Sequence, residues 1–105
     1  MNRVLHRYIL FLLALLTFTV TMQAKRVYIY GNIHDENGLP VELATINEEK
    51  SLTHSISNLQ GDYNITVSYN DTISLVFRMV GHEIRKRYIY NADDTVRLDV
   101  MLPNN

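Results

Sequence analysis

The segment Ser57-Asn58-Leu59-Gln60-Gly61-Asp62-Tyr63 is a polar turn that leads directly into the alternating run Tyr63-Asn64-Ile65-Thr66-Val67. Asn58 can hydrogen-bond to nearby backbone groups, and Gly61 can adopt a positive φ without a steric penalty. Apolar and polar residues alternate after the turn with the period of two that is expected of a half-buried strand. We therefore interpret this stretch as a tight reversal that forms a β-hairpin with one solvated face.

Six further short runs are expected to be strands, and turn residues separate them. Asn37-Gly38 and Gly81 mark two of these turns, because their residue types favour reversing backbone angles. Gly31, inside the first run, predicts a bulge or the close approach of another backbone. Short strands with turns about every eight to twelve residues indicate an all-β protein, a seven-stranded antiparallel β-sandwich. The expected strands are 27–33, 43–48, 52–56, 63–67, 72–79, 83–90 and 95–102.

Two of these strands carry more detailed expectations. In 72–79 the odd-numbered residues are apolar and predicted to face the core, whereas the even-numbered ones, Ser74 and Val76 among them, are predicted to face outward. The run 83–90 contains Arg85-Lys86-Arg87, and such charge is typical of an edge strand, where it discourages pairing with another chain.

The N-terminal residues indicate export. Arg3 and Arg7 precede an apolar run of 13 residues, Tyr8 to Val20, and Thr21-Met22-Gln23-Ala24 supplies a small-residue cleavage site. A membrane-spanning helix needs roughly 20 apolar residues, so the run is short for a transmembrane anchor. We predict a secretory signal peptide at 1–24 and an exported domain at 25–105.

The composition of residues 25–105 narrows the class of protein. Eight basic and eleven acidic side chains give this part of the chain a net charge of −3 with neutral histidines. A nucleic-acid partner is not expected, because such partners require a basic excess or stripe. The chain has no cysteine, so the domain must rely on its apolar core rather than on disulfides or cysteine-bound zinc.

The sequence offers no catalytic, cofactor-binding or metal-binding constellation. His34, His54 and His82 are far apart and lack the spacing that places two metal ligands on one helical face. None of the serines lies in a nucleophile-elbow motif. Glu48-Glu49 and Asp93-Asp94 fall in expected turns, where solvation explains them, so we predict no enzymatic activity.

Four tyrosines are the candidate binding residues. Tyr28 and Tyr30 alternate with core residues of the first strand, and Tyr88 and Tyr90 lie in the charged strand. Exposed aromatic rings of this kind can form a binding face for a glycan or a peptide. The alternative is that the rings cover the second face of a twisted sheet and pair across strands.

Five short motifs occur in order along the expected domain. They are Gly31, Asn37-Gly38-x-Pro40, Ala44-Thr45-Ile46, Ser57-Asn58-x-x-Gly61-x-Tyr63 and Val80-Gly81. Together they resemble the carboxypeptidase regulatory-like (transthyretin-like) domain. Three positions depart from the usual pattern of that domain: Ser57 replaces threonine, Asn58 replaces aspartate, and His82 replaces an aromatic residue.

The resemblance implies a transthyretin-like β-sandwich without catalysis of its own. In Bacteroidetes such a domain commonly follows the signal peptide of TonB-dependent outer-membrane receptors and lies on the periplasmic side. We therefore expect a non-enzymatic periplasmic accessory domain that contacts protein partners of the outer-membrane uptake system. It would be the N-terminal extension, whole or truncated, of a TonB-dependent nutrient-uptake receptor. The alternative is a free-standing exported module that binds carbohydrate or peptide, or mediates adhesion.

Overall fold

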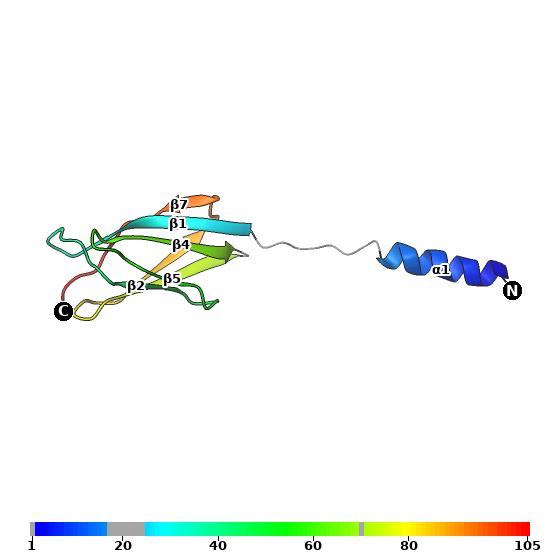
Figure 1. The fold of residues 1–105 in the computed structure, drawn as a ribbon, viewed down its shortest axis with the longest axis horizontal. Coiled ribbons are helices and arrows are strands. Elements are labelled where there is room, and N and C mark those ends of the chain that lie inside the picture. The colour runs from blue at the N-terminus through cyan, green and yellow to red at the C-terminus, as the bar shows by residue number, and fades with distance from the viewer. Residues whose placement is uncertain (1, 17–24, 70) are drawn as a thin grey trace.

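The computed structural model describes residues 2–16, 25–69 and 71–105. One helix, α1 (Asn2–Leu16), precedes eight strands that form a β-sandwich, so the all-β prediction is confirmed (Figure 1). The strands are β1 (Lys25–His34), β2 (Thr45–Glu48), β3 (His54–Ile56), β4 (Asp62–Tyr69), β5 (Thr72–Arg78), β6 (Arg85–Tyr90), β7 (Thr95–Arg97) and β8 (Val100–Met101).

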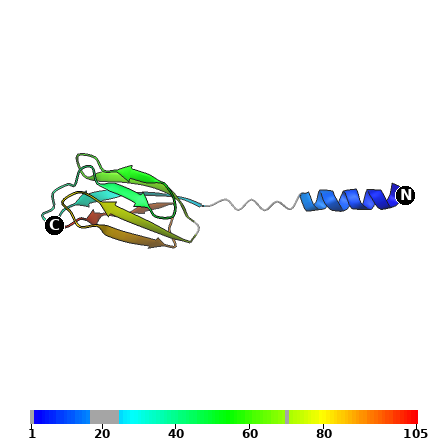
Figure 2. The same ribbon diagram turned by 90° about the horizontal axis from the view of Figure 1, so that it is seen from below.

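Two sheets make up the sandwich, as the two views show (Figures 1 and 2). One sheet has the order β4-β1-β7, with β8 also paired to β1, and the other has the order β3-β2-β5-β6. The core lies between them. In β1 the alternating residues Val27 and Ile29 are fully buried, whereas Tyr28 and Tyr30 remain exposed on the outer face. Each fully buried aliphatic side chain stabilises the fold by about 1.5–3 kcal/mol.

An aromatic contact within the core joins the two sheets. The rings of Tyr63 in β4 and Phe77 in β5 have centroids 5.4 Å apart and cross at 81°. Such edge-to-face packing is favourable because the positive edge of one ring meets the negative face of the other. The odd-numbered residues of β5 are therefore inward, as predicted.

The even-numbered residues Ser74 and Val76 face outward from the core, as predicted, but they are nevertheless buried. β5 is an inner strand, flanked by β2 and β6. Ser74 lies opposite Tyr88 of β6, and Val76 lies opposite Lys86. Long neighbouring side chains thus shield the short ones, whereas β6 has only one neighbour and is the edge strand that its charges predicted.

The predicted hairpin at residues 57–63 was wrong. β3 pairs with β2 and β4 pairs with β1, so the turn carries the chain from one sheet to the other. Its local geometry is nevertheless as expected: Gly61 has a φ of 81°, and Asn58 Oδ1 accepts hydrogen bonds from the N–H groups of Gln60 and Asp62. The residues specify the turn, but not which strands it joins.

The last predicted strand, 95–102, is divided into β7 and β8, and both pair with β1 in parallel. The other strand pairs are antiparallel. The interruption lies beside Gly31, where a Cβ atom would be 1.9 Å from the carbonyl oxygen of Leu98. The predicted close approach of another backbone at Gly31 is therefore confirmed.

Strand β2 begins two residues later than predicted, because Leu43 has a φ of 61°. The cause lies at Ser57, which is buried. Its hydroxyl donates to the carbonyl oxygen of Val41 at 2.7 Å and accepts from the N–H of Ala44 at 2.9 Å. This bridge holds residues 41–44 in a compact turn, and β3 likewise starts at His54 rather than at 52.

Candidate functional site

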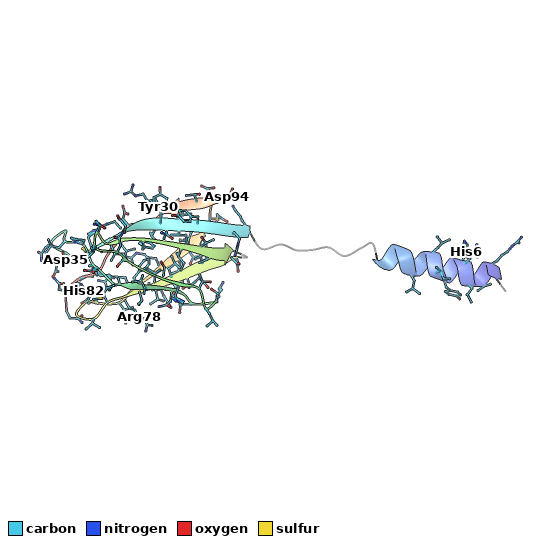
Figure 3. The ribbon with its side chains drawn as sticks, in the orientation of Figure 1. His6, Tyr30, Asp35, Arg78, His82 and Asp94 are labelled. Atoms are coloured by element: carbon cyan, nitrogen blue, oxygen red, sulfur yellow. The ribbon has the colours of Figure 1, made fainter. Side chains whose placement is uncertain are left out.

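The strongest candidate for a site is the outer face of the sheet β4-β1-β7. Tyr28 and Tyr30 of β1 project from this face, and 42% and 38% of their surfaces are exposed. Their ring centroids are 5.9 Å apart and the rings are inclined by only 23°. Figure 3 shows Tyr30 on the side of β1 that faces away from the other sheet.

A shallow hollow of about 370 Å³ adjoins these rings. Tyr30 lies opposite Asn64 of β4 on one side and Arg97 of β7 on the other, so the strand register brings an amide and a guanidinium to the aromatic pair. Aromatic rings beside amide and guanidinium donors can bind a ligand that has both apolar and hydroxyl surfaces. The lining residues are Tyr28, Tyr30, Gly31, Asn32, Asp62, Tyr63, Asn64 and Arg97.

Hydrogen bonds fix the floor of this hollow. Asn32 Nδ2 donates to Asp62 Oδ1 at 2.9 Å, and the backbone N–H of Asn32 donates to Asp99 Oδ1 at 2.8 Å. Arg97 Nε lies 3.4 Å from Asp99 Oδ2. The side chains of Asn32 and Arg97 are thus held in place by neighbouring carboxylates.

Tyr88 and Tyr90 form a second, separate pair on the outer face of the other sheet. Their centroids are 6.4 Å apart with the rings inclined by 25°, and the Lys86 ammonium lies 5.6 Å from the Tyr88 ring centroid. The four tyrosines therefore do not share one face. Each pair stacks along its own strand rather than across strands.

The predicted turn residues have clear structural places. Gly38, Gly61 and Gly81 all adopt positive φ. The N–H of Asn37 donates to Asp35 Oδ1 at 2.9 Å, which closes the loop after β1. Asn58 braces the turn before β4, as described above.

The neighbouring carboxylates Glu48 and Glu49 each have a structural partner. Contrary to the prediction of a solvated turn, Glu48 is the buried last residue of β2, and its Oε2 accepts from the N–H of Lys50 at 2.8 Å. Glu49 is exposed and pairs with Lys86 Nζ at 2.8 Å. Hydrogen bonds from Lys86 and then Ser74 lower the pKa of Glu49, and the bond to Glu49 raises the pKa of Lys86.

The hydroxyl of Tyr63 is held inside the domain. The hydroxyl donates to the carbonyl oxygen of Leu98 at 2.6 Å. Burial raises the pKa of the phenol well above its ordinary value of 10, and the negative charge of Asp99 adds to the shift. Its role is to join β4 to the segment between β7 and β8.

Within residues 2–16, 25–69 and 71–105, no three metal-ligating side chains gather into a metal site. His54 Nδ1 lies 3.2 Å from the carbonyl oxygen of Leu52, and His82 Nδ1 lies 3.1 Å from that of Leu102. Both rings thus contact the backbone beside them.

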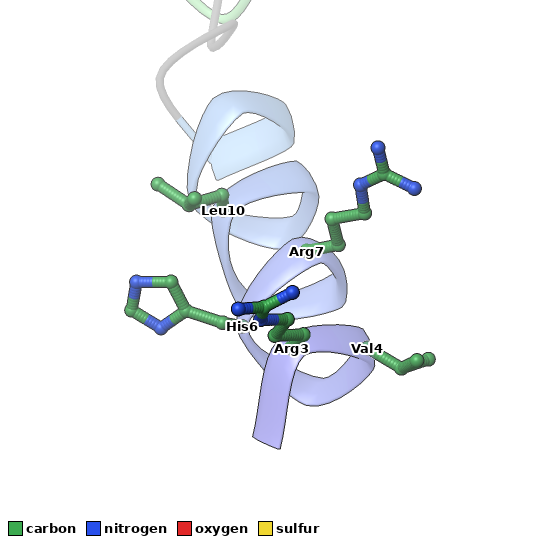
Figure 4. Close-up of a pocket in the computed structure, with 5 residues that line it drawn as sticks. All are labelled: Arg3, Val4, His6, Arg7 and Leu10. Atoms are coloured by element: carbon green, nitrogen blue, oxygen red, sulfur yellow. The ribbon is translucent and has the colours of Figure 1, made fainter. Parts of the chain in front are cut away.

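Other hollows are less promising. Along α1, a hollow of about 640 Å³ is lined by Arg3, Val4, His6, Arg7 and Leu10 of that single helix, so no second element closes it (Figure 4). A hollow of about 390 Å³ on the other sheet lies beside Gly81 and His82. In the part of the chain that the structure describes, no helix has the length and apolarity to cross a membrane. The predicted cleavage site after residue 24 lies outside the described residues.

Comparison with known proteins supports the fold. No protein-family model matches the chain, and no curated protein matches it. The chain is similar to the solved structure of chlorocatechol 1,2-dioxygenase from Pseudomonas putida, with a TM-score of 0.66 and 11% identity over 81% of this chain. It is also similar to a type II cohesin–X-dockerin complex from Acetivibrio cellulolyticus, with a TM-score of 0.53 and 12% identity over 71% of this chain. It spans 63% and 51% of the lengths of those two chains. At such low identity the likeness shows an all-β sandwich-like fold and nothing about activity.

Proposed function

We propose that this chain is a non-enzymatic accessory domain on the periplasmic side of the outer membrane, and that it forms the N-terminal extension of a TonB-dependent nutrient-uptake receptor. The main support for the proposal is that the motif residues that resemble this family make specific contacts in the fold. Gly31 admits the Leu98 carbonyl, Ser57 bridges Val41 to Ala44, and Gly61 turns against Ile33. These contacts give each of the three motif residues a structural role, which supports the assignment to a carboxypeptidase regulatory-like domain.

The titratable groups favour a role without catalysis. Shifted pKa values usually gather where acid–base chemistry is done. Here the shifted groups of the described residues are an exposed ion pair, Glu49 with Lys86, and the buried Tyr63, and they do not share a hollow. The domain is thus expected to act by contact.

The helix α1 supports export. Its apolar side chains are exposed, with Ile9, Leu10 and Phe11 showing 49%, 58% and 69% of their surfaces. No described residue of the sandwich core comes from this helix. N-terminal sequencing of protein recovered from the periplasmic fraction should begin near Lys25, whereas a start at Met1 in the cytosolic fraction would contradict the proposal.

The receptor assignment is tested by the DNA beyond codon 105. A continuing or frameshifted reading frame for a plug and a β-barrel is the expected result. A stop codon followed by an unrelated gene would contradict it and favour the free-standing module.

The second candidate, a free-standing exported carbohydrate- or peptide-binding module, is favoured by the hollow beside Tyr28 and Tyr30. Binding of the purified domain to an array of neutral glycans and peptides would test it, with Tyr30→Ala as the variant. Tyr90→Ala is the matched control, because it removes the same side chain from the opposite outer face. Loss of binding in Tyr30→Ala alone would support this function, and equal binding by both variants would exclude the hollow.

A further inference from the structure

The backbone of β1 shows which groups of its sheet are already paired. The N–H of Tyr28 donates to the carbonyl oxygen of Asp94, and the carbonyl oxygen of Tyr30 accepts from the N–H of Leu98. The even-numbered residues of β1 therefore bond on the β7 side. Because backbone groups alternate in direction along a strand, its odd-numbered residues bond toward β4.

The same alternation identifies the free side of β4. Its odd-numbered residues, from Tyr63 to Val67, lie opposite odd-numbered residues of β1 and form the paired positions. Asn64, Thr66 and Ser68 consequently direct their N–H and C=O groups away from β1, at the end of the sheet. Their side chains are exposed.

The edge strand β4 lacks the charged side chains that the edge strand β6 of the other sheet carries. β4 has eight residues and, apart from Asp62 at its start, carries no charged side chain. The edge strand β6 contains Arg85-Lys86-Arg87. Charged residues on an edge oppose pairing with another chain, and a long uncharged edge invites it.

We propose that β4 pairs antiparallel with β4 of a second copy of this chain, with the two Thr66 residues facing each other on the two-fold axis. In this register Asn64 lies opposite Ser68 of the second copy. Every free backbone group of the three residues is then satisfied on both chains, which gives about six hydrogen bonds. Any other register of the two edges leaves some of these groups unpaired.

A second copy suits this edge because a two-fold interface must be self-complementary. The side chains that meet on the outer face are hydroxyls and amides, so no like charges oppose each other. An exposed leucine lies near each end of the free edge of β4. Leu59 precedes the start of β4. Leu52 lies in the turn after β2, and the hydrogen bond from Lys50 Nζ to the carbonyl oxygen of Thr72 holds this turn near the start of β5. The two-fold axis brings the Leu59 end of one copy toward the Leu52 end of the second copy. The inference does not depend on the receptor assignment.

The experiment is sedimentation of residues 25–105, which contain the whole core from Val27 to Leu102. The mass of the wild type should rise toward twice the monomer mass between about 10 µM and about 1 mM. Thr66→Lys should weaken self-association at least about tenfold, since like charges then meet on the axis. Thr95→Lys is the matched control, because Thr95 is an exposed threonine of β7 that lies opposite the same Tyr28.

Two further results decide the register. Thr66→Lys and Thr66→Glu should each self-associate at least about tenfold more weakly than the wild type, and their mixture should restore the dimer through opposite charges on the axis. Amide hydrogen exchange at Asn64, Thr66 and Ser68 should slow as wild-type concentration rises. A wild type that stays monomeric at about 1 mM, a Thr66→Lys variant that dimerises as tightly as the wild type, or equal weakening in Thr95→Lys would overturn the proposal.

Discussion

The turns at 57–62 and 79–82 look alike locally and differ in what surrounds them. Gly61 and Gly81 have φ values of 81° and 84°, and a backbone hydrogen bond spans each turn. A Cβ atom on Gly61 would lie 2.3 Å from the carbonyl oxygen of Ile33, whereas one on Gly81 would meet nothing within 4 Å. Gly61 is therefore required for two reasons and Gly81 for one: the first turn is part of the packing between sheets, and the second is only a reversal at the surface.

The largest expected effect comes from Gly61→Val. Strain at positive φ costs about 1–2 kcal/mol, and the clash with the backbone of β1 adds to it, so we expect at least about 3 kcal/mol of lost unfolding free energy. Gly81→Val should cost only the strain. Urea denaturation of the two variants checks this, and equal midpoints would show that the surroundings of Gly61 are not as described.

Ser57→Ala should come next, at about 2 kcal/mol, because it leaves the Val41 carbonyl and the Ala44 N–H without the buried hydroxyl that joins them. Ser51→Ala is the control, since Ser51 is exposed. A loss that is equally small in both variants would contradict the bridging role of Ser57.

Tyr63→Phe removes the hydrogen bond to the Leu98 carbonyl and should cost about 1 kcal/mol at neutral pH. The folded pKa of Tyr63 is raised, so its contribution is fully present below pH 10 and is lost as the pH rises above that value. The stability of the wild type should thus fall more steeply above pH 10 than that of the variant. Parallel curves of stability against pH would exclude this linkage.

The smallest effect is expected for Glu49→Gln, because its partner Lys86 is also on the surface. The folded pKa of Glu49 lies below its ordinary value of 4.5, so the contribution is present above pH 4.5 and is lost as the pH falls through the folded pKa. Thermal melting should show a small difference at pH 7 that closes in acid. A difference that grows in acid would contradict the assignment.

Features that depend on a few neighbouring residues could be predicted from the sequence. Gly61 and Asn58 specify their turn through their own backbone preferences, and alternation placed Tyr28 and Tyr30 on the outside of β1. The charges of β6 correctly indicated an edge.

Features that depend on partners distant in the sequence could not be predicted. Alternation says which residues share a face, but not which strand lies alongside, so the turn at 57–62 looked like a hairpin and the four tyrosines looked like one surface. The residues around Leu43 do not predict its positive φ. This backbone angle depends on the Ser57 hydroxyl, which is distant in the sequence and accepts a hydrogen bond from the N–H of Ala44. The burial of Val76 likewise depends on its neighbours in the sheet.

The parallel pairing of β1 with β7 and β8 also has a mechanical consequence. The chain enters the sandwich at one end of β1 and leaves at the other end, beyond β8 (Figure 1). Tension applied to the two ends would act along these strands and shear all their hydrogen bonds together, instead of opening them one after another. A domain with this topology can transmit force between its two ends before it unfolds.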